Sequence, residues 1–115
     1  LPYSRIVGEV KGRRVIILDD MVDTGRTLVR AAEGATAAGA AIVDACCVHG
    51  IFSGLAVERL ESSPLRTVTV TDTVPLSEAA VRSGKIRTLS IAPILAKVIK
   101  NIHDEESASA HFAPE

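Results

Sequence analysis

Four apolar runs rich in β-branched residues alternate along this chain with segments of helical periodicity. The runs cover residues 15–18, 42–48, 68–71 and 86–91, and the first helical segment covers 26–38. Such runs are typical of strands that are buried on both faces of a parallel sheet. Because parallel strands must be joined by crossovers, the alternation predicts an α/β fold with a mainly parallel sheet flanked by helices.

The remaining segments complete this picture. We expect a short helix at about 55–61, a short helix or loop at 76–84, and a final amphipathic helix that begins near Pro93. Residues 5–10 are a candidate for an additional edge strand. The length of 115 residues predicts a single domain over 1–115, with a polar tail over 104–115.

Composition excludes several classes of protein. The formal net charge is -1 and no basic stripe is present, which argues against a nucleic-acid partner. No apolar run approaches the roughly 20 residues that span a bilayer, so no membrane is expected. The start of the chain does not resemble a signal peptide, so cytoplasmic residence is expected. The adjacent Cys46 and Cys47 should point to opposite faces of a strand, and we interpret both as small core residues.

The strongest chemical signal lies where the first apolar run ends. Two acids, two apolar residues and the segment Asp23-Thr24-Gly25-Arg26-Thr27 follow it and lead into the helical segment. Ligands of open α/β sheets bind at the carboxyl ends of the strands. A helix start adds unpaired N–H groups and a partial positive charge, which favour a phosphate. The segment therefore predicts an anion-binding loop, in which Gly25 lets the backbone bend toward the anion.

The side chains around this loop indicate which anion it binds. The hydroxyls of Thr24 and Thr27 can donate hydrogen bonds to a phosphate. Asp19 and Asp20 cannot, but they can accept bonds from sugar hydroxyls or hold a divalent cation through water. The combination favours a phosphorylated sugar over inorganic phosphate. The alternative is that Asp23 or Thr24 only caps the helix.

These residues resemble the phosphoribosyl-binding motif of type I phosphoribosyltransferases and of ribose-phosphate pyrophosphokinases. Further segments resemble the pyrophosphokinases in the same order along the chain, at residues 6–12, 49–54, 70–76, 95–96 and 106–112. The resemblance runs from about Ile6 to Phe112, and it is to the carboxyl-terminal part of that family.

The resemblance implies a phosphoribosyltransferase-like, Rossmann-like fold and a transferase reaction. Members of the family transfer diphosphate from ATP to ribose 5-phosphate with Mg²⁺, and they release phosphoribosyl pyrophosphate and AMP. The resemblance assigns neither a catalytic residue nor a metal ligand to this chain. The expected ribose-5-phosphate-binding residues are Asp19, Asp20, Asp23, Thr24, Gly25, Arg26 and Thr27.

The tail has its own implied role. In the family, the residues similar to Ser107, Ser109 and Phe112 help to form a regulatory site for phosphate or ADP between subunits. The resemblance also implies a homo-oligomer. A frayed terminus explains the composition of this tail equally well.

Two departures from the family pattern affect these expectations. Arg26 replaces a second glycine that is common in the pyrophosphokinases, and it would be strained if that position required a positive φ. The resemblance also implies that an amino-terminal half supplies most contacts to ATP and Mg²⁺, so we expect this chain alone not to turn over ATP.

Two alternative functions remain open at this stage. One is a nucleobase phosphoribosyltransferase, and the other is a non-catalytic regulatory or scaffold relative. His49 ends the second apolar run on the ligand side, where a structural role is more common than a catalytic one.

Overall fold

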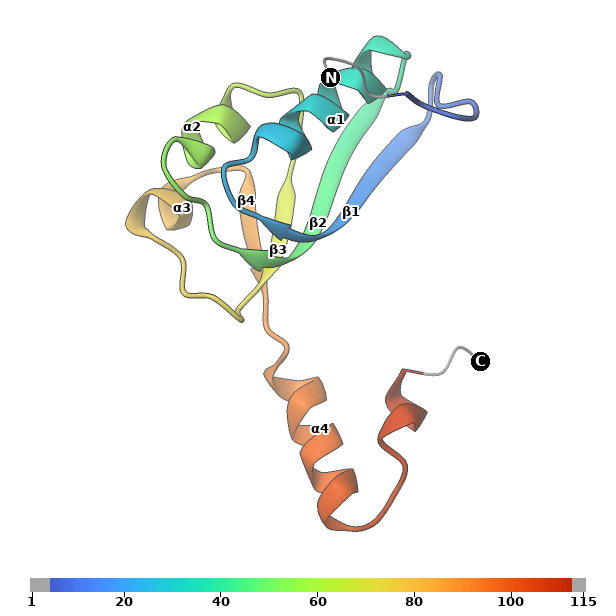
Figure 1. Cartoon of the computed structure of the whole chain (residues 1–115), viewed down its shortest axis with the longest axis vertical. Helices are drawn as coiled ribbons and strands as arrows, with labels where there is room; N and C mark the ends of the chain where they lie inside the picture. The colour runs from blue at the N-terminus through green and yellow to red at the C-terminus, as the bar shows by residue number, and fades with distance from the viewer. Residues whose placement is uncertain (1–4, 113–115) are drawn as a thin grey trace.

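The computed structural model describes residues 5–112, and they form a parallel α/β fold with an extended helical arm (Figure 1). The elements in chain order are β1 (Arg14–Val22), α1 (Arg26–Ala37), β2 (Ile42–Gly50), α2 (Ala56–Glu61), β3 (Val68–Thr71), α3 (Glu78–Arg82), β4 (Ile86–Leu89), α4 (Ala92–His103) and the 3-10 helix η1 (Ala108–His111). The four strands are parallel and lie in the order β1-β2-β3-β4. The predicted fold class is therefore confirmed.

The core lies between the sheet and the helices that connect its strands. Alternate residues of the central strands face these helices, as the buried Ala45 of β2 and its neighbour Val68 of β3 illustrate. Leu28 of α1 and Leu60 of α2 cover them from the helical side. Because each strand pairs with the next one in sequence, right-handed crossovers bring α1, α2 and α3 to the same face of the sheet.

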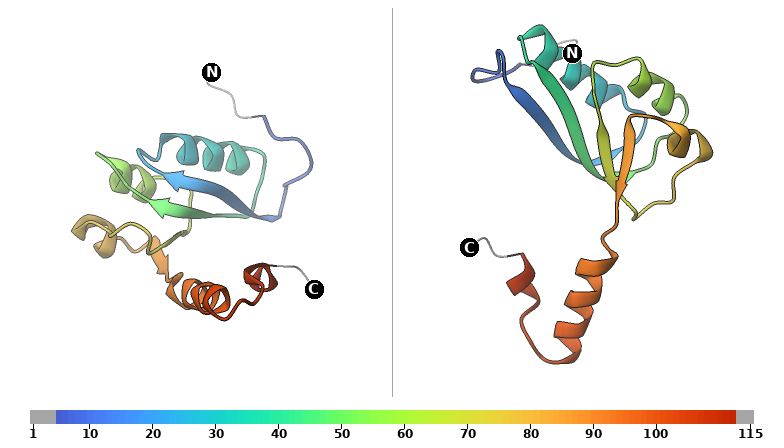
Figure 2. Two further views of the ribbon diagram at one scale, coloured as in Figure 1. Left: turned by 60° about the horizontal axis from the view of Figure 1, so that its bottom comes forward. Right: turned by 180° about the vertical axis from the view of Figure 1, so that it is seen from behind.

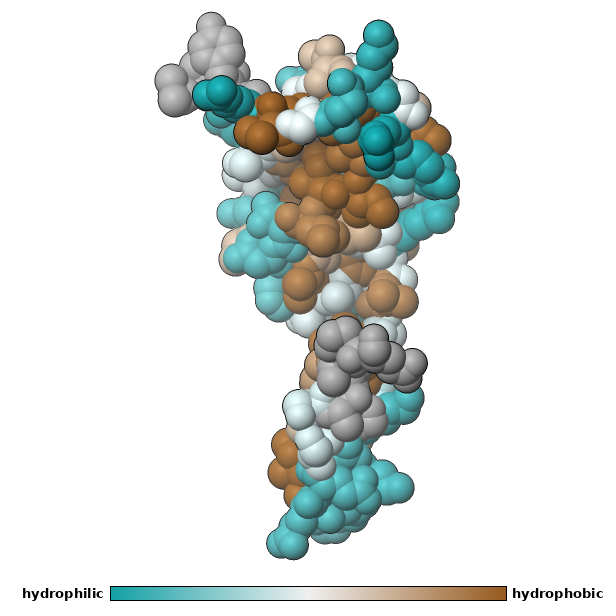
Figure 3. Space-filling model, turned by 90° about the vertical axis from the view of Figure 1, so that its right-hand side faces the viewer, coloured by the Kyte–Doolittle hydropathy of each residue, from teal (hydrophilic) through white to brown (hydrophobic). Residues whose placement is uncertain are grey.

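The opposite face of the sheet is not covered by the described residues. Large apolar side chains lie exposed on it, and Figure 3 shows them as a band over the sheet; they include Ile16, Leu18, Val48 and Leu89. We call these four residues the bare sheet face. Cys46 is exposed on this side, so its predicted core role is wrong. Cys47 points into the core as predicted, and burial raises the pKa of its thiol to about 11.

The helix α4 extends away from the sheet (Figures 1 and 2). Its apolar stripe has the predicted helical period, but none of its residues is buried, and Leu95, Ile99 and Ile102 are exposed. The arm gives the molecule an elongated shape of 50 × 36 × 25 Å. None of the helices within residues 5–112 combines the length and hydrophobicity that crossing a membrane requires.

Three sequence-based boundaries need correction. Residues 5–10 form no strand, because the chain turns at Gly8 and Gly12, and Gly12 N–H donates to Gly39 O at 2.8 Å. The first strand continues past the apolar run to Val22, because its pairing with β2 persists to Gly50. The last strand stops at Leu89 instead of residue 91, where Ile91 N–H donates to the Asp72 carboxylate at 3.0 Å.

Candidate functional site

The loop between β1 and α1 has the shape that an anion requires. Gly25 stands directly before the helix with φ 81°, in the left-handed region that favours glycine. No side chain caps the helix, so the alternative in which Asp23 or Thr24 acts only as the cap is wrong. The carboxylate of Asp23 instead accepts a short hydrogen bond from the Ser53 hydroxyl, on the neighbouring loop.

The backbone N–H groups at the start of α1 precede the hydrogen-bond ladder of the helix. Val29 N–H donates to Gly25 O at 2.9 Å. The amides of Arg26, Thr27 and Leu28 come before it, in the turn where N–H groups have no partner within the helix. They supply the partial positive charge that attracts an anion.

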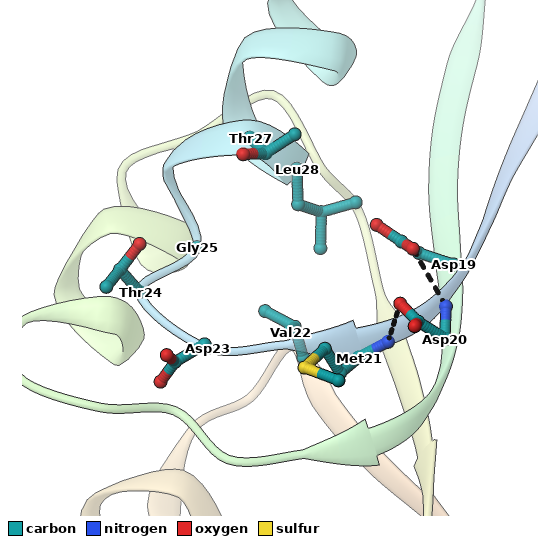
Figure 4. A pocket seen from close by; sticks show the side chains of 9 residues that line it. All are labelled: Asp19, Asp20, Met21, Val22, Asp23, Thr24, Gly25, Thr27 and Leu28. Carbon is teal, nitrogen blue, oxygen red and sulfur yellow. Dashed lines mark hydrogen bonds between the residues drawn. The ribbon is translucent and has the colours of Figure 1, made fainter.

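The loop, the start of α1 and the end of β1 line an open cavity of about 220 Å³ (Figure 4). Its lining residues are Asp19, Asp20, Met21, Val22, Asp23, Thr24, Gly25, Thr27 and Leu28. Six of the seven residues expected to bind the sugar phosphate therefore lie together. Arg26 does not line the cavity, although its backbone belongs to the same turn, and it does not have the positive φ that would have strained it.

The paired acids stand on the strand side of the cavity. They lie within β1, and not at its end as predicted. Asp20 N–H donates to Asp19 Oδ1 and Met21 N–H donates to Asp20 Oδ1, each at 2.8 Å. Each bond uses one oxygen of a carboxylate, and both side chains are exposed. Within residues 5–112 no group of three or more His, Cys, Asp or Glu side chains is placed so that it could hold a metal ion by itself, so a cation at this pair would need oxygens from its ligand and water.

The segment that follows β2 donates hydrogen bonds to carbonyl groups of the loop between β1 and α1. Ser53 N–H donates to Asp23 O at 2.9 Å, and the guanidinium Nη1 of Arg59, in α2, donates to Thr24 O at 2.8 Å. Sequence reasoning identified the 49–54 segment only as a motif and missed Arg59 entirely. No local pattern could have revealed it, because 35 residues separate it from Thr24.

A second polar group lies at the ends of β2 and β3. His49 Nδ1 is 2.7 Å from Thr73 Oγ1, and the Thr71 hydroxyl donates to Val48 O at 2.6 Å. These bonds tie the two strand ends together. They give His49 a structural partner, in agreement with the interpretation preferred from the sequence.

The expected regulatory residues lie on the α4–η1 arm, outside the cavity. The hydroxyls of Ser107 and Ser109 are 2.9 Å apart, and Asn101 Nδ2 donates to Ser107 O at 2.9 Å. Phe112 ends this part of the chain with an exposed ring. The structure thus brings the two serines together, but what they bind stays a prediction.

Comparison with known proteins gives a consistent result. The chain is 46% identical over 110 residues to the ribose-phosphate pyrophosphokinase of Clostridium acetobutylicum, a match that covers 96% of this chain and 34% of that protein. It is 52% identical over 108 residues to the enzyme of the same name from Bordetella pertussis, covering 94% of this chain and 35% of that protein.

A solved structure agrees with these matches. The crystal structure of phosphoribosylpyrophosphate synthetase from Mycobacterium smegmatis superposes with a TM-score of 0.83 at 38% identity, over 91% of this chain and 35% of that one.

The chain therefore spans about a third of the length of these relatives. The further expectation that this third is the carboxyl-terminal one is not borne out by the matches. The sequence profile of the phosphoribosyl synthetase-associated domain matches residues 1–113, which is nearly the whole chain. The chain belongs to the phosphoribosyl synthetase-associated domain family.

Proposed function

We propose that this chain forms the ribose-5-phosphate end of a ribose-phosphate pyrophosphokinase site. The proposal rests mainly on one observation: an uncapped helix start and a pair of carboxylates share one cavity. A phosphate alone would be repelled by the carboxylates, and a sugar alone would not need the helix start. A sugar phosphate fits both features, because its phosphate can bind at the helix start and its hydroxyls can donate to the carboxylates.

Within this proposal the ester phosphate binds at the start of α1. The amides of Arg26 and Thr27 and the hydroxyls of Thr24 and Thr27 donate to its oxygens. The hydroxyls of the ribose then donate to the free oxygens of Asp19 and Asp20. The cavity of about 220 Å³ is smaller than the roughly 300–1,000 Å³ of drug-sized sites, which agrees with a small ligand.

The reaction that we propose transfers diphosphate from ATP to the anomeric hydroxyl of ribose 5-phosphate. Such a transfer depends on positioning and charge neutralisation more than on covalent chemistry. Asp19 and Asp20, whose remaining oxygens face the ribose hydroxyls in this proposal, could hold Mg²⁺ through bound water, with the diphosphate oxygens as its direct ligands. Bound there, Mg²⁺ would neutralise charge on the diphosphate.

Two further proposals concern assembly and regulation. The close hydroxyls of Ser107 and Ser109 support a phosphate or ADP site on the arm, to which Phe112 is tied by a backbone bond from its N–H to Ser109 O at 3.0 Å. The bare sheet face and the exposed stripe of α4 support a homo-oligomer, because both are apolar surfaces without a described partner.

The proposal is tested by following AMP release from ATP and ribose 5-phosphate. We expect release by any longer form of the gene product that carries the ATP-binding half, and none by this chain alone. Pyrophosphate release from phosphoribosyl pyrophosphate and a nucleobase would instead support the phosphoribosyltransferase alternative. Absence of both activities in this chain and in any longer form, with ribose 5-phosphate still bound, would leave a non-catalytic relative.

A further inference from the structure

Three consecutive carbonyl groups of the anion loop are held by one segment of the chain. Val22 O accepts from the amides of Ile51 and Phe52, at 3.0 and 3.2 Å. Asp23 O accepts from Ser53 N–H at 2.9 Å. Thr24 O accepts from Arg59 Nη1 at 2.8 Å.

These bonds also fix the direction of the following amides. In a trans peptide the C=O and the next N–H point in opposite directions, and the described residues contain no cis peptide. A carbonyl that is held toward α2 therefore aims the N–H of the next residue away from α2. In this way the bonds to Asp23 O and Thr24 O fix the directions of the N–H groups of Thr24 and Gly25.

The Thr24–Gly25 peptide differs from the others in how it is held. Its carbonyl is bound by the end of a side chain, whereas backbone amides bind the two carbonyls before it. Gly25 also tolerates both signs of φ, so this peptide can flip with little steric cost. A flipped peptide would turn the carbonyl oxygen of Thr24 toward the side on which the anion binds.

The positive charge of Arg59 also favours binding of a phosphate ester in this cavity. Three carboxylates, those of Asp19, Asp20 and Asp23, line the cavity. A phosphate ester brings further negative charge, which the partial charge of a helix start offsets only in part. A guanidinium bound to the loop lowers this cost.

We propose that Arg59 is a positioning residue for the sugar phosphate: it holds the Thr24–Gly25 peptide so that Gly25 N–H faces the ester. The contact of α2 with the loop supports this, because a Cβ built on Gly25 would lie 3.6 Å from Ala56 O and 3.7 Å from Leu60 Cγ. The helix thus stands directly behind the peptide that it orients. This inference rests on the proposed function for the nature of the ligand.

The test compares Arg59→Gln and Arg59→Lys with the wild-type chain. Arg82→Gln is the matched control, because it makes the same change of charge on α3, where Arg82 makes only a 4.0 Å surface ion pair with Glu78. Calorimetric titration with ribose 5-phosphate should show about tenfold weaker binding for Arg59→Gln, as expected if Gly25 N–H no longer makes its one hydrogen bond to the charged ester. Arg59→Lys should retain part of the affinity, and Arg82→Gln all of it.

A second readout separates positioning from general destabilisation. In ¹H–¹⁵N spectra without ligand, Arg59→Gln should broaden or shift the amides of residues 24–26 through peptide exchange, while the thermal midpoint stays near that of Arg82→Gln. Arg59→Lys should show a smaller change of the same kind. It is the test variant if Arg59→Gln does not fold.

Two outcomes distinguish the inference from the proposed function. Unchanged affinity and unchanged loop amides in Arg59→Gln would overturn the inference even though the wild type binds. A wild-type chain that does not bind ribose 5-phosphate would contradict the proposed function, and the unliganded spectra would still decide whether Arg59 orients the loop.

Discussion

Gly25 carries the conformation on which the anion loop depends. Its φ of 81° is strained for any residue with a side chain, although a Cβ would meet only ordinary contacts there. Conformation, not space, therefore requires glycine at this position.

Replacing Gly25 by alanine should both destabilise the fold and weaken the site. We expect Gly25→Ala to lower the free energy of unfolding by about 1 kcal/mol or more, because alanine resists a positive φ. Binding of ribose 5-phosphate should fall with it. Gly84→Ala is the control, since a Cβ there meets nothing within 4 Å and φ is not positive. Equal stability of the two variants in urea unfolding would contradict this account.

Asp44 forms the best-connected ion pair of the described chain. It accepts bonds from Arg66 Nε and Nη2, at 3.0 and 2.5 Å, and from Thr67 N–H and Oγ1, at 3.1 and 2.8 Å. The bond from Arg66 is the main cause that holds the pKa of the Asp44 carboxyl below its ordinary value of 3.8.

This lowered pKa predicts a dependence of stability on pH. A carboxyl whose pKa is lower in the folded state stabilises the fold above its ordinary, unfolded pKa. That contribution is lost as the pH falls through the folded pKa. The stability difference between wild type and Asp44→Asn should therefore be largest near neutral pH and shrink in acid. Thermal unfolding across the pH range checks this, and a difference that grows in acid would refute it.

At the scale of elements, α2 links the core to the site. Leu60 points into the core and is fully buried, while Arg59 of the same helix holds the loop. Loosening the core side of α2 should therefore disturb the fold and the loop together.

Truncation of Leu60 tests the contribution of α2 to stability. We expect Leu60→Ala to cost about 2–5 kcal/mol, because it removes buried methyl groups and leaves a cavity. Leu55→Ala is a suitable control, since Leu55 stands at the start of the same helix with 60% of its surface exposed. Urea unfolding of both variants measures the difference, and similar losses would show that α2 is not part of the core.

The sequence predicted most elements, and its errors have physical causes. Apolar runs and helical periodicity located β1 to β4 and the helices within a few residues. Pairing with β2 extended β1 through its acids, which no hydrophobic pattern records. Glycines turned residues 5–12 away from the sheet. Arg59 escaped notice because its contact depends on α1 and α2 lying on one face.

At the scale of the whole molecule, the uncovered apolar surfaces are the main feature. The bare sheet face follows from the sequential strand order, which places α1, α2 and α3 on one side. The sequence indicated strands buried on both faces, whereas in the described residues only one face is covered. Apolar surface of this kind favours association.

We expect this chain to self-associate through the bare sheet face. Leu18 is 77% exposed and Leu89 is 63% exposed, so replacing both by serine should reduce association without loss of core packing. Light scattering coupled to size-exclusion chromatography measures the mass, and thermal unfolding checks the fold. A monomeric wild type, or a double variant that associates equally well, would count against this surface.

The central claim is that the start of α1 binds the phosphate of a sugar phosphate. The most direct measurement is a ¹H–¹⁵N titration of this chain with ribose 5-phosphate, with ribose as the uncharged comparison. We predict that the amides of residues 24–28 shift with ribose 5-phosphate and stay unchanged with ribose. Shifts confined to other residues, or no shifts in this loop, would contradict the account.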